Sequence, residues 1–237
     1  MFQLPLSVAL RDDASFDNFS VNNNELLVNK IQQCIGQKVS EGSIFFWGEN
    51  TAGKTHLLQA ACAQAASLEL NAAYIPLAVA HELDVKILHG LESFDLICID
   101  DIDLIAGQAN WEKAVFELYN RTFESNSQIV ITATHSLKET PLQLPDLISR
   151  LSWGFVFHLL ALTDDEKPKA LQAHAKVRGF ELPDNVATYL LNHYPRDMNV
   201  QCGLLDELDK ATLTAQRKLS VPFVKQWLDP IATPSLL

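Results

Sequence analysis

The eight residues from position 48 to position 55 are the part of this sequence that most directly indicates chemistry. They read GENTAGKT, which places Gly48, Gly53, Lys54 and Thr55 at the spacing GxxxxGKT. Glycines at these positions let successive backbone N–H groups turn inward around a phosphate, and a following helix adds the positive end of its dipole. In such a loop the lysine reaches the β- and γ-phosphates of a nucleotide, and the threonine hydroxyl binds Mg²⁺. The expected phosphate site comprises Gly48, Glu49, Asn50, Thr51, Ala52, Gly53, Lys54, Thr55 and His56.

A second candidate group ends the apolar stretch DLICIDD at residues 95–101. Carboxylates at the end of a buried strand are suited to holding the coordination shell of a magnesium ion. We expect Asp100 to orient water bound to the metal. We expect Asp101 to polarise the water that attacks the γ-phosphate, as the equivalent group does in related ATPases. The alternative for this pair is a solvated strand end, and Asp103 is expected to face solvent.

A third apolar stretch, QIVITATHS at residues 128–136, also ends in polar residues. Thr132, Thr134 or His135 is placed to present a polar group toward the γ-phosphate. Threonine in a strand is equally typical of β-branched packing, so the sequence leaves both interpretations open.

A parallel sheet would bring these three groups together. Apolar runs without polar alternation, separated by helical patterns, indicate such a sheet covered on both faces. Strands are expected near residues 43–48, 72–77, 95–100 and 128–134, with helices near 54–69, 79–91 and 110–124. After GFVFHLLAL no strand pattern returns, and helices are expected near 164–178, 184–194, 197–216 and 222–228.

The composition excludes several classes of protein. The net charge is −11, from 18 basic and 29 acidic residues, so direct tight binding to DNA is not expected. The apolar start MFQLPLSVAL is too short to span a membrane and lacks the basic region of a signal peptide. Four widely spaced cysteines without a CxxC pattern indicate buried free thiols in a reducing cytoplasm. They are Cys34, Cys62, Cys98 and Cys202.

The order of these motifs, followed by PDLISRLSWGFVF and a helical region, resembles the AAA+ ATPases of the replication-initiator clade. The similarity to the initiator DnaA covers most of residues 14–216. It implies an α/β nucleotide-binding domain with a five-stranded parallel sheet at 14–161, and a small all-helical lid at 162–237. It also implies that Phe19 and Val21 line the base pocket. Arg150, in SRLSWG, would be an arginine finger that reaches the nucleotide of a neighbouring subunit.

One position departs from the family. The lid often carries a basic residue that touches bound phosphate, and the matching position here is Asn199. Arg196 lies nearly one helical turn earlier and is a candidate substitute, although a solvated arginine explains it equally well. If neither residue reaches the phosphate, this chain's own ATP hydrolysis should be weak or absent.

The sequence also has neither the long N-terminal interaction domain nor the DNA-reading helix-turn-helix module of the full initiator. A single AAA+ unit preceded by QLPLS resembles the Hda family of DnaA-homologous regulators. This resemblance implies that residues 1–13 are a flexible peptide in which Gln3, Leu4 and Leu6 bind the β sliding clamp of DNA polymerase III. It implies that the AAA+ unit then stimulates hydrolysis of the ATP bound to DnaA, which prevents re-initiation of replication.

The resemblance further implies a bound nucleoside diphosphate, and ADP is the favoured candidate. Mg²⁺ would be held by Thr55 and, through water, by Asp100. AAA+ surfaces could also pair copies of the chain in a homo-oligomer. The competing functions are a stand-alone AAA+ ATPase, such as a helicase loader, and a small-molecule kinase. A competing role for the N-terminal strip is to cover an apolar patch on its own AAA+ core.

Overall fold

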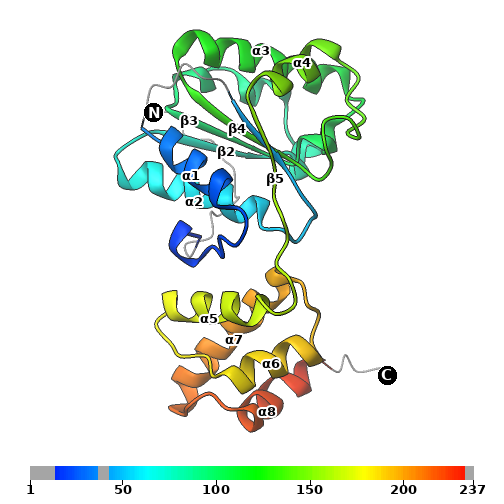
Figure 1. Cartoon of the computed structure of the whole chain (residues 1–237). Coiled ribbons are helices and arrows are strands. Elements are labelled where there is room, and N and C mark those ends of the chain that lie inside the picture. The colour runs from blue at the N-terminus through cyan, green and yellow to red at the C-terminus, as the bar shows by residue number, and fades with distance from the viewer. Residues whose placement is uncertain (1–13, 37–42, 233–237) are drawn as a thin grey trace. The chain divides into compact units, whose positions relative to one another are not determined.

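The computed structural model describes residues 14–36 and 43–232 (Figure 1). Within these residues, strands and helices alternate as far as residue 158, and helices alone follow. No helix in this part of the chain is long and apolar enough to cross a membrane. In chain order the helices and strands are α1 (Glu25–Cys34), β1 (Ile44–Trp47), α2 (Lys54–Ser67), β2 (Ala72–Pro76), β3 (Leu96–Asp100), α3 (Ala109–Ser125), β4 (Gln128–Ala133), α4 (Pro145–Trp153), β5 (Phe155–His158), α5 (Lys167–Val177), α6 (Asp184–His193), α7 (Met198–Ala215) and α8 (Val221–Ala232).

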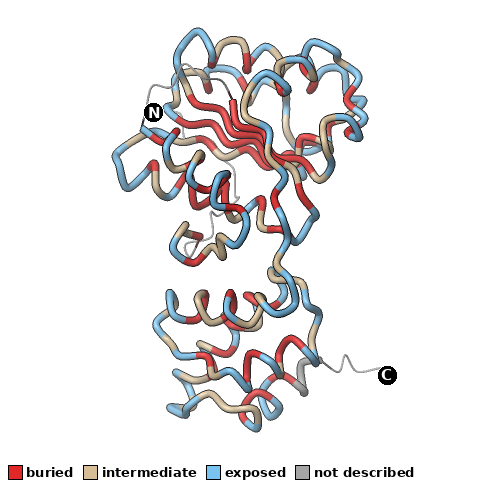
Figure 2. Tube along the Cα trace, in the orientation of Figure 1, coloured by how far each residue is buried: buried red, intermediate tan, exposed pale blue. Residues whose placement is uncertain are grey.

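The five strands form one parallel sheet in the order β2-β3-β4-β1-β5. The predicted five-stranded parallel sheet is therefore confirmed. Every residue of β3 and β4 is buried, which explains why their sequences show no polar alternation (Figure 2). In the edge strand β5, half-buried residues alternate with exposed ones.

The register of the sheet gathers the three polar groups of the sequence at one edge. Trp47 of β1 pairs with Ala133 of β4, and Ile99 of β3 pairs with Ile131 of β4. The chain leaves these strands into Gly48, Asp101 and Thr134. In parallel α/β sheets the carboxyl ends of the strands carry the ligand site, so the topology brings together residues that are far apart in sequence.

The connection between β2 and β3 differs from the prediction. The helix expected near 79–91 is absent, and three short 3₁₀ helices take its place. The side chain of Asp84 accepts a hydrogen bond from the Lys86 N–H and starts a new turn, while Gly90 has a left-handed φ of 83°. These local interactions compete with a continuous helix. The apolar residues of this connection still enter the core. The 3₁₀ helices among the described residues are η1 (Phe16–Asn18), η2 (Leu77–Glu82), η3 (Val85–Leu88), η4 (Leu91–Ser93) and η5 (Ile102–Ile105).

The contacts divide the described residues into two compact units. The first comprises residues 14–17 and 21–161, and the second comprises 18–20 and 162–232. Each unit has its own apolar core, the first between the sheet and its helices and the second among α5 to α8. The core of the second unit includes Leu171, Val186, Leu190, Leu205 and Val224.

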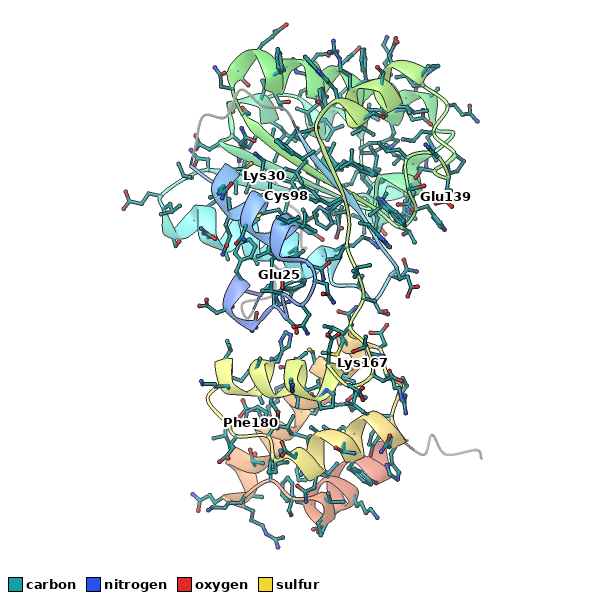
Figure 3. All side chains as sticks on the ribbon, in the orientation of Figure 1. Glu25, Lys30, Cys98, Glu139, Lys167 and Phe180 are labelled. Atoms are coloured by element: carbon teal, nitrogen blue, oxygen red, sulfur yellow. The ribbon has the colours of Figure 1, made fainter. Side chains whose placement is uncertain are left out.

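All four cysteines lie within the described residues and are buried free thiols, as predicted. Cys98 lies in the middle of β3, two residues before Asp100 (Figure 3). A hydrogen bond with Cys62, and next burial, raise the pKa of the Cys98 thiol.

Gly154 joins α4 to β5 where the backbone has no room for a side chain. The Phe155 N–H donates to the Ser43 carbonyl at 2.8 Å, so the segments that contain these two residues run side by side. A Cβ atom on Gly154 would lie only 2.1 Å from that carbonyl oxygen. By contrast, a Cβ on Gly203, within α7, would meet nothing within 4 Å.

We therefore expect opposite effects from the two glycine-to-alanine substitutions. Gly154→Ala should lower the free energy of unfolding of the first unit by roughly 2 kcal/mol, because the backbone must move to admit the methyl group. Gly203→Ala should raise that of the second unit by roughly 0.5 to 1 kcal/mol, because alanine favours a helix more than glycine does. Denaturant unfolding followed by circular dichroism measures both. Equal stability of Gly154→Ala and the unaltered protein would contradict the packing described here.

Candidate functional site

The loop after β1 is shaped by its two glycines. A Cβ on Gly48 would lie 2.5 Å from the Leu159 carbonyl oxygen, so only glycine lets the loop pass the end of β5. Gly53 has a φ of 99° and directly precedes α2, a left-handed conformation that glycine adopts without strain. The loop consequently opens onto a helix N-terminus, whose free N–H groups and dipole favour an anion.

The ammonium group of Lys54 lies buried inside this loop. Only 3% of the residue is exposed. Its Nζ donates to the carbonyl of Gly48 at 2.9 Å and to that of Glu49 at 3.4 Å, and it lies 3.4 Å from Oδ1 of Asp101. A buried charge is costly unless it is paired, and these three oxygens satisfy it. The loop thus holds a positive charge at the place where phosphates would bind.

Three hydroxyl groups hold the carboxylate of Asp100. Thr55 Oγ1 and Tyr74 Oη each donate to its Oδ2 at 2.7 Å, and Thr132 Oγ1 donates to its Oδ1 at 2.6 Å. Charge-assisted hydrogen bonds of this length are among the stronger ones in proteins. Burial, and next the negative charge of Asp100, raise the pKa of Tyr74, so the phenol keeps its proton and remains a donor.

Asp101 has the left-handed backbone conformation, with a φ of 56°, immediately after β3. Its N–H donates to Thr132 Oγ1 at 2.9 Å. Its buried Oδ1 has no hydrogen-bond partner among the described residues, because the 3.4 Å contact with Lys54 is an ion pair without hydrogen-bond geometry. Burial and the charge of Asp100 raise the pKa of Asp101, and Lys54 partly offsets them. Strain and an unsatisfied buried oxygen at one residue are typical of functional sites.

The end of β4 joins this site through Thr134. Its N–H donates to Asp103 Oδ1 at 2.9 Å, and its hydroxyl donates to Asn50 Oδ1 at 3.2 Å. The expectation that Asp103 faces solvent was wrong, because this half-buried carboxylate ties the turn after β3 to the end of β4. Both Thr132 and Thr134 thus contact the predicted site. His135 contributes its carbonyl to a turn, accepting from the Thr140 hydroxyl at 3.3 Å.

Tyr74 is a site residue that the sequence analysis missed. It lies within AAYIP, a run that reads as an ordinary edge strand. The available signal was its hydroxyl group, since a tyrosine in an apolar strand generally finds a hydrogen-bond partner when it is buried.

Arg150 lies in the last turn of α4, in the first unit. Its guanidinium carbon is 5.5 Å from the centre of the Trp153 ring, and the indole is 61% exposed. No described residue forms an ion pair with Arg150. The structure therefore presents a cation supported by an aromatic ring.

Arg196 and Asn199 belong to the second unit. Arg196 Nη1 forms an ion pair with Asp164 Oδ2 at 2.6 Å, and its Nε donates to the Leu191 carbonyl at 3.1 Å. The Asn199 N–H donates to Asp197 Oδ1 at 2.7 Å at the start of α7. Binding of Arg196 to a phosphate would require it to leave Asp164.

The other predicted positions are distributed along the chain. The half-buried Phe19 groups with the second unit, and the half-buried Val21 with the first. His56 hydrogen-bonds the Ser15 carbonyl at 3.0 Å. Ala52 is buried and Thr51 is exposed within the loop. Gln3, Leu4 and Leu6 lie outside the described residues.

Solved structures of DnaA and RuvB have the same fold as this chain. Domain III of the Thermotoga maritima replication initiation protein DnaA superposes with a TM-score of 0.75, at 20% identity over 95% of this chain and 100% of that one. AMPPCP-bound DnaA from Aquifex aeolicus gives 0.68, at 21% identity over 86% of this chain and 67% of that one. The Thermotoga maritima RuvB Holliday junction branch migration motor gives 0.65, at 16% identity over 93% and 72%.

Two family models match the chain, one in each unit. The bacterial DnaA ATPase domain matches residues 10–158, more than half of the sequence, and the Hda lid domain matches residues 164–228. The chain therefore belongs to the bacterial DnaA ATPase domain family and is an AAA+ protein of the Hda and DnaA type.

Proposed function

We propose that this protein is a nucleotide-bound AAA+ regulator that binds the β sliding clamp and stimulates hydrolysis of the ATP bound to DnaA. This activity would prevent re-initiation of chromosome replication. We propose that the protein acts in the cytoplasm. The observation that carries the nucleotide part is the buried Lys54 ammonium at the helix N-terminus. It faces an Asp101 oxygen that has no hydrogen-bond partner in the part of the chain that the structure describes. The match to the Hda lid supports a regulator in place of a full initiator.

The loop residues 48–56 would hold the phosphates of a nucleoside diphosphate, ADP in our proposal. A DnaA structure of the same fold contains the nucleotide analogue AMPPCP, which supports the binding of a nucleotide in general. The oxygen set formed by Thr55, Asp100 and Asp101 is of the kind that Mg²⁺ prefers. Thr55 would bind the ion directly and Asp100 through water. The ion, when bound, neutralises phosphate charge.

Hydrolysis by this chain should be weak. Asn199 carries no positive charge, and Arg196 is already paired with Asp164. A missing cation leaves negative charge on a transferring phosphoryl group less stabilised. The nucleotide would then act mainly to stabilise the folded chain.

Arg150 would act on DnaA and not on this chain's own nucleotide. A guanidinium on the half-exposed face of α4, with no ion-pair partner among residues 14–36 and 43–232, can approach the γ-phosphate of ATP held by a neighbouring protein. Its planar group forms paired hydrogen bonds with phosphate oxygens and stabilises charge in the transition state.

The N-terminal sequence QLPLS supplies the proposed clamp contact. Pro5 favours an extended chain, with Leu4 and Leu6 on one face and the amide of Gln3 available for backbone groups. Two buried leucines are worth about 1.5 to 3 kcal/mol each, less the cost of ordering the peptide, which predicts a contact in the micromolar range.

One observation favours a stand-alone ATPase as a second candidate function. Lys54, Thr55, Asp100 and Asp101 are all present, with Thr55 hydrogen-bonded to Asp100 and Lys54 paired with Asp101. This alternative predicts multiple turnovers of ATP by the isolated protein, whereas the proposed regulator should hydrolyse its own ATP slowly and accelerate only the hydrolysis of ATP bound to DnaA.

Arg150→Ala should abolish stimulation of DnaA. An arginine finger contributes roughly 10³-fold or more to hydrolysis, so the rate of ATP hydrolysis by DnaA with clamp and variant should fall by that order. Binding of ADP to the variant itself should stay unchanged, because the finger acts in trans. Lys86→Ala, which removes a cation that is 78% exposed, is the matched control. Loss of ADP binding by Arg150→Ala, with DnaA stimulation retained, would show that the assignment is wrong.

Replacing Gln3, Leu4 and Leu6 together with alanine should abolish binding to the sliding clamp, measured by surface plasmon resonance. Clamp-dependent inactivation of DnaA should be lost as well, and the melting temperature should not change. Val8→Ala combined with Leu10→Ala removes similar apolar area outside QLPLS and should leave clamp binding intact. A triple variant that melts earlier yet still binds the clamp would mean that the strip packs on its own fold.

A further inference from the structure

Tyr74 is the least expected member of the Asp100 network. It lies on β2, the strand at one edge of the sheet, and pairs in register with Cys98 of β3. Its hydroxyl nevertheless donates at 2.7 Å to Asp100, two residues further along β3. Thr55, at the start of α2, donates to the same carboxylate oxygen. The hydroxyl groups of Tyr74 and Thr55 therefore meet at Asp100 Oδ2.

The hydrogen bonds of Asp100 determine where the lone pairs of Thr55 point. Each hydroxyl has a single proton, and Thr55 donates its proton to Asp100 Oδ2. Its oxygen lone pairs are consequently left for a cation. This orientation depends on a fixed carboxylate. Tyr74 holds the oxygen that Thr55 uses, and Thr132 holds the other one.

We propose that Tyr74 is a positioning residue of the magnesium–nucleotide site, which holds Asp100 so that Thr55 presents its lone pairs to the metal ion. This inference rests on the proposed nucleotide binding. It assigns Tyr74 a role through Asp100 and Thr55, without direct contact to the ion or to the phosphates. Residues that orient metal ligands in this way typically contribute 10- to 100-fold to metal affinity.

Tyr74→Phe tests the inference, because it removes the donor and keeps the ring. The full-length protein is titrated with MgCl₂ in the presence of fluorescent N-methylanthraniloyl-ADP, and separately with the probe in EDTA. The concentration of Mg²⁺ at half-maximal effect should rise about 10-fold. The affinity for the probe in EDTA should be unchanged, since the phenol does not touch the phosphates.

Two further variants make the result specific. Tyr119→Phe is the matched control, because it also removes a buried tyrosine hydroxyl in the first unit, one that lies 3.1 Å from Ser43 Oγ. It should not change the Mg²⁺ dependence. Thr132→Val removes the donor to the other Asp100 oxygen and should raise the Mg²⁺ requirement as Tyr74→Phe does. Thr132→Val also supplies the test if Tyr74→Phe does not fold.

The outcomes separate this inference from the proposed function. An unchanged Mg²⁺ midpoint in Tyr74→Phe would overturn the positioning role while leaving nucleotide binding in place. An equal shift in Tyr119→Phe, or an equal loss with and without Mg²⁺, would overturn it in favour of a purely structural tyrosine. If the unaltered protein does not bind the probe, the proposed function fails as well.

Discussion

The buried ammonium group of Lys54 is the charge on which the arrangement of the site depends. It lies inside a loop that only glycine at position 48 allows to form, and it is held by two backbone carbonyls and by Asp101. These partners offset the cost of burying the charge, but no described residue donates a hydrogen bond to the buried oxygen of Asp101. An anion at the loop would give the ammonium group stronger partners, which is why the site favours phosphate.

The sheet positions every other group around this charge. Because β1, β3 and β4 are parallel neighbours, or one strand apart, their carboxyl ends supply the loop, the Asp100–Asp101 pair and the threonines at one edge. The hydroxyls of Thr55, Tyr74 and Thr132 then fix Asp100 from α2, β2 and β4. The carboxylate is thus oriented by elements from three separate parts of the chain, and packing of the sheet keeps it in place.

How far the site could be predicted depends on how local its determinants are. The spacing GxxxxGKT and the acidic end of an apolar strand are local patterns, and they were enough to indicate Lys54, Thr55, Asp100 and Asp101. The parallel sheet also followed from apolar runs without alternation. Tyr74 could not be assigned in this way, because its hydrogen bond to Asp100 exists only after β2 and β3 pair.

The remaining differences have the same origin. Asp103 was expected in solvent, but it meets Thr134 because β3 and β4 end together. The turn at Asp84 and the left-handed Gly90 prevent the continuous helix that the apolar pattern near 79–91 predicts. The apolar residues of this segment still enter the core, but from short 3₁₀ helices. In each case a contact between distant segments, or a competing side-chain hydrogen bond, decided the outcome.

The most direct measurement is the identification of the small molecule that the purified protein carries. Protein prepared without added nucleotide is denatured, and the released material is analysed by mass spectrometry for the unaltered chain, Lys54→Ala and Lys113→Ala, which removes a cation that is 74% exposed. The account predicts a nucleoside diphosphate with the unaltered chain and with Lys113→Ala, and none with Lys54→Ala. Added ADP at a hundredfold excess over its dissociation constant should stabilise only the first two, by about 2.7 kcal/mol. Equal release of nucleotide by Lys54→Ala, or an unaltered chain that carries none and does not bind added ADP, would contradict it.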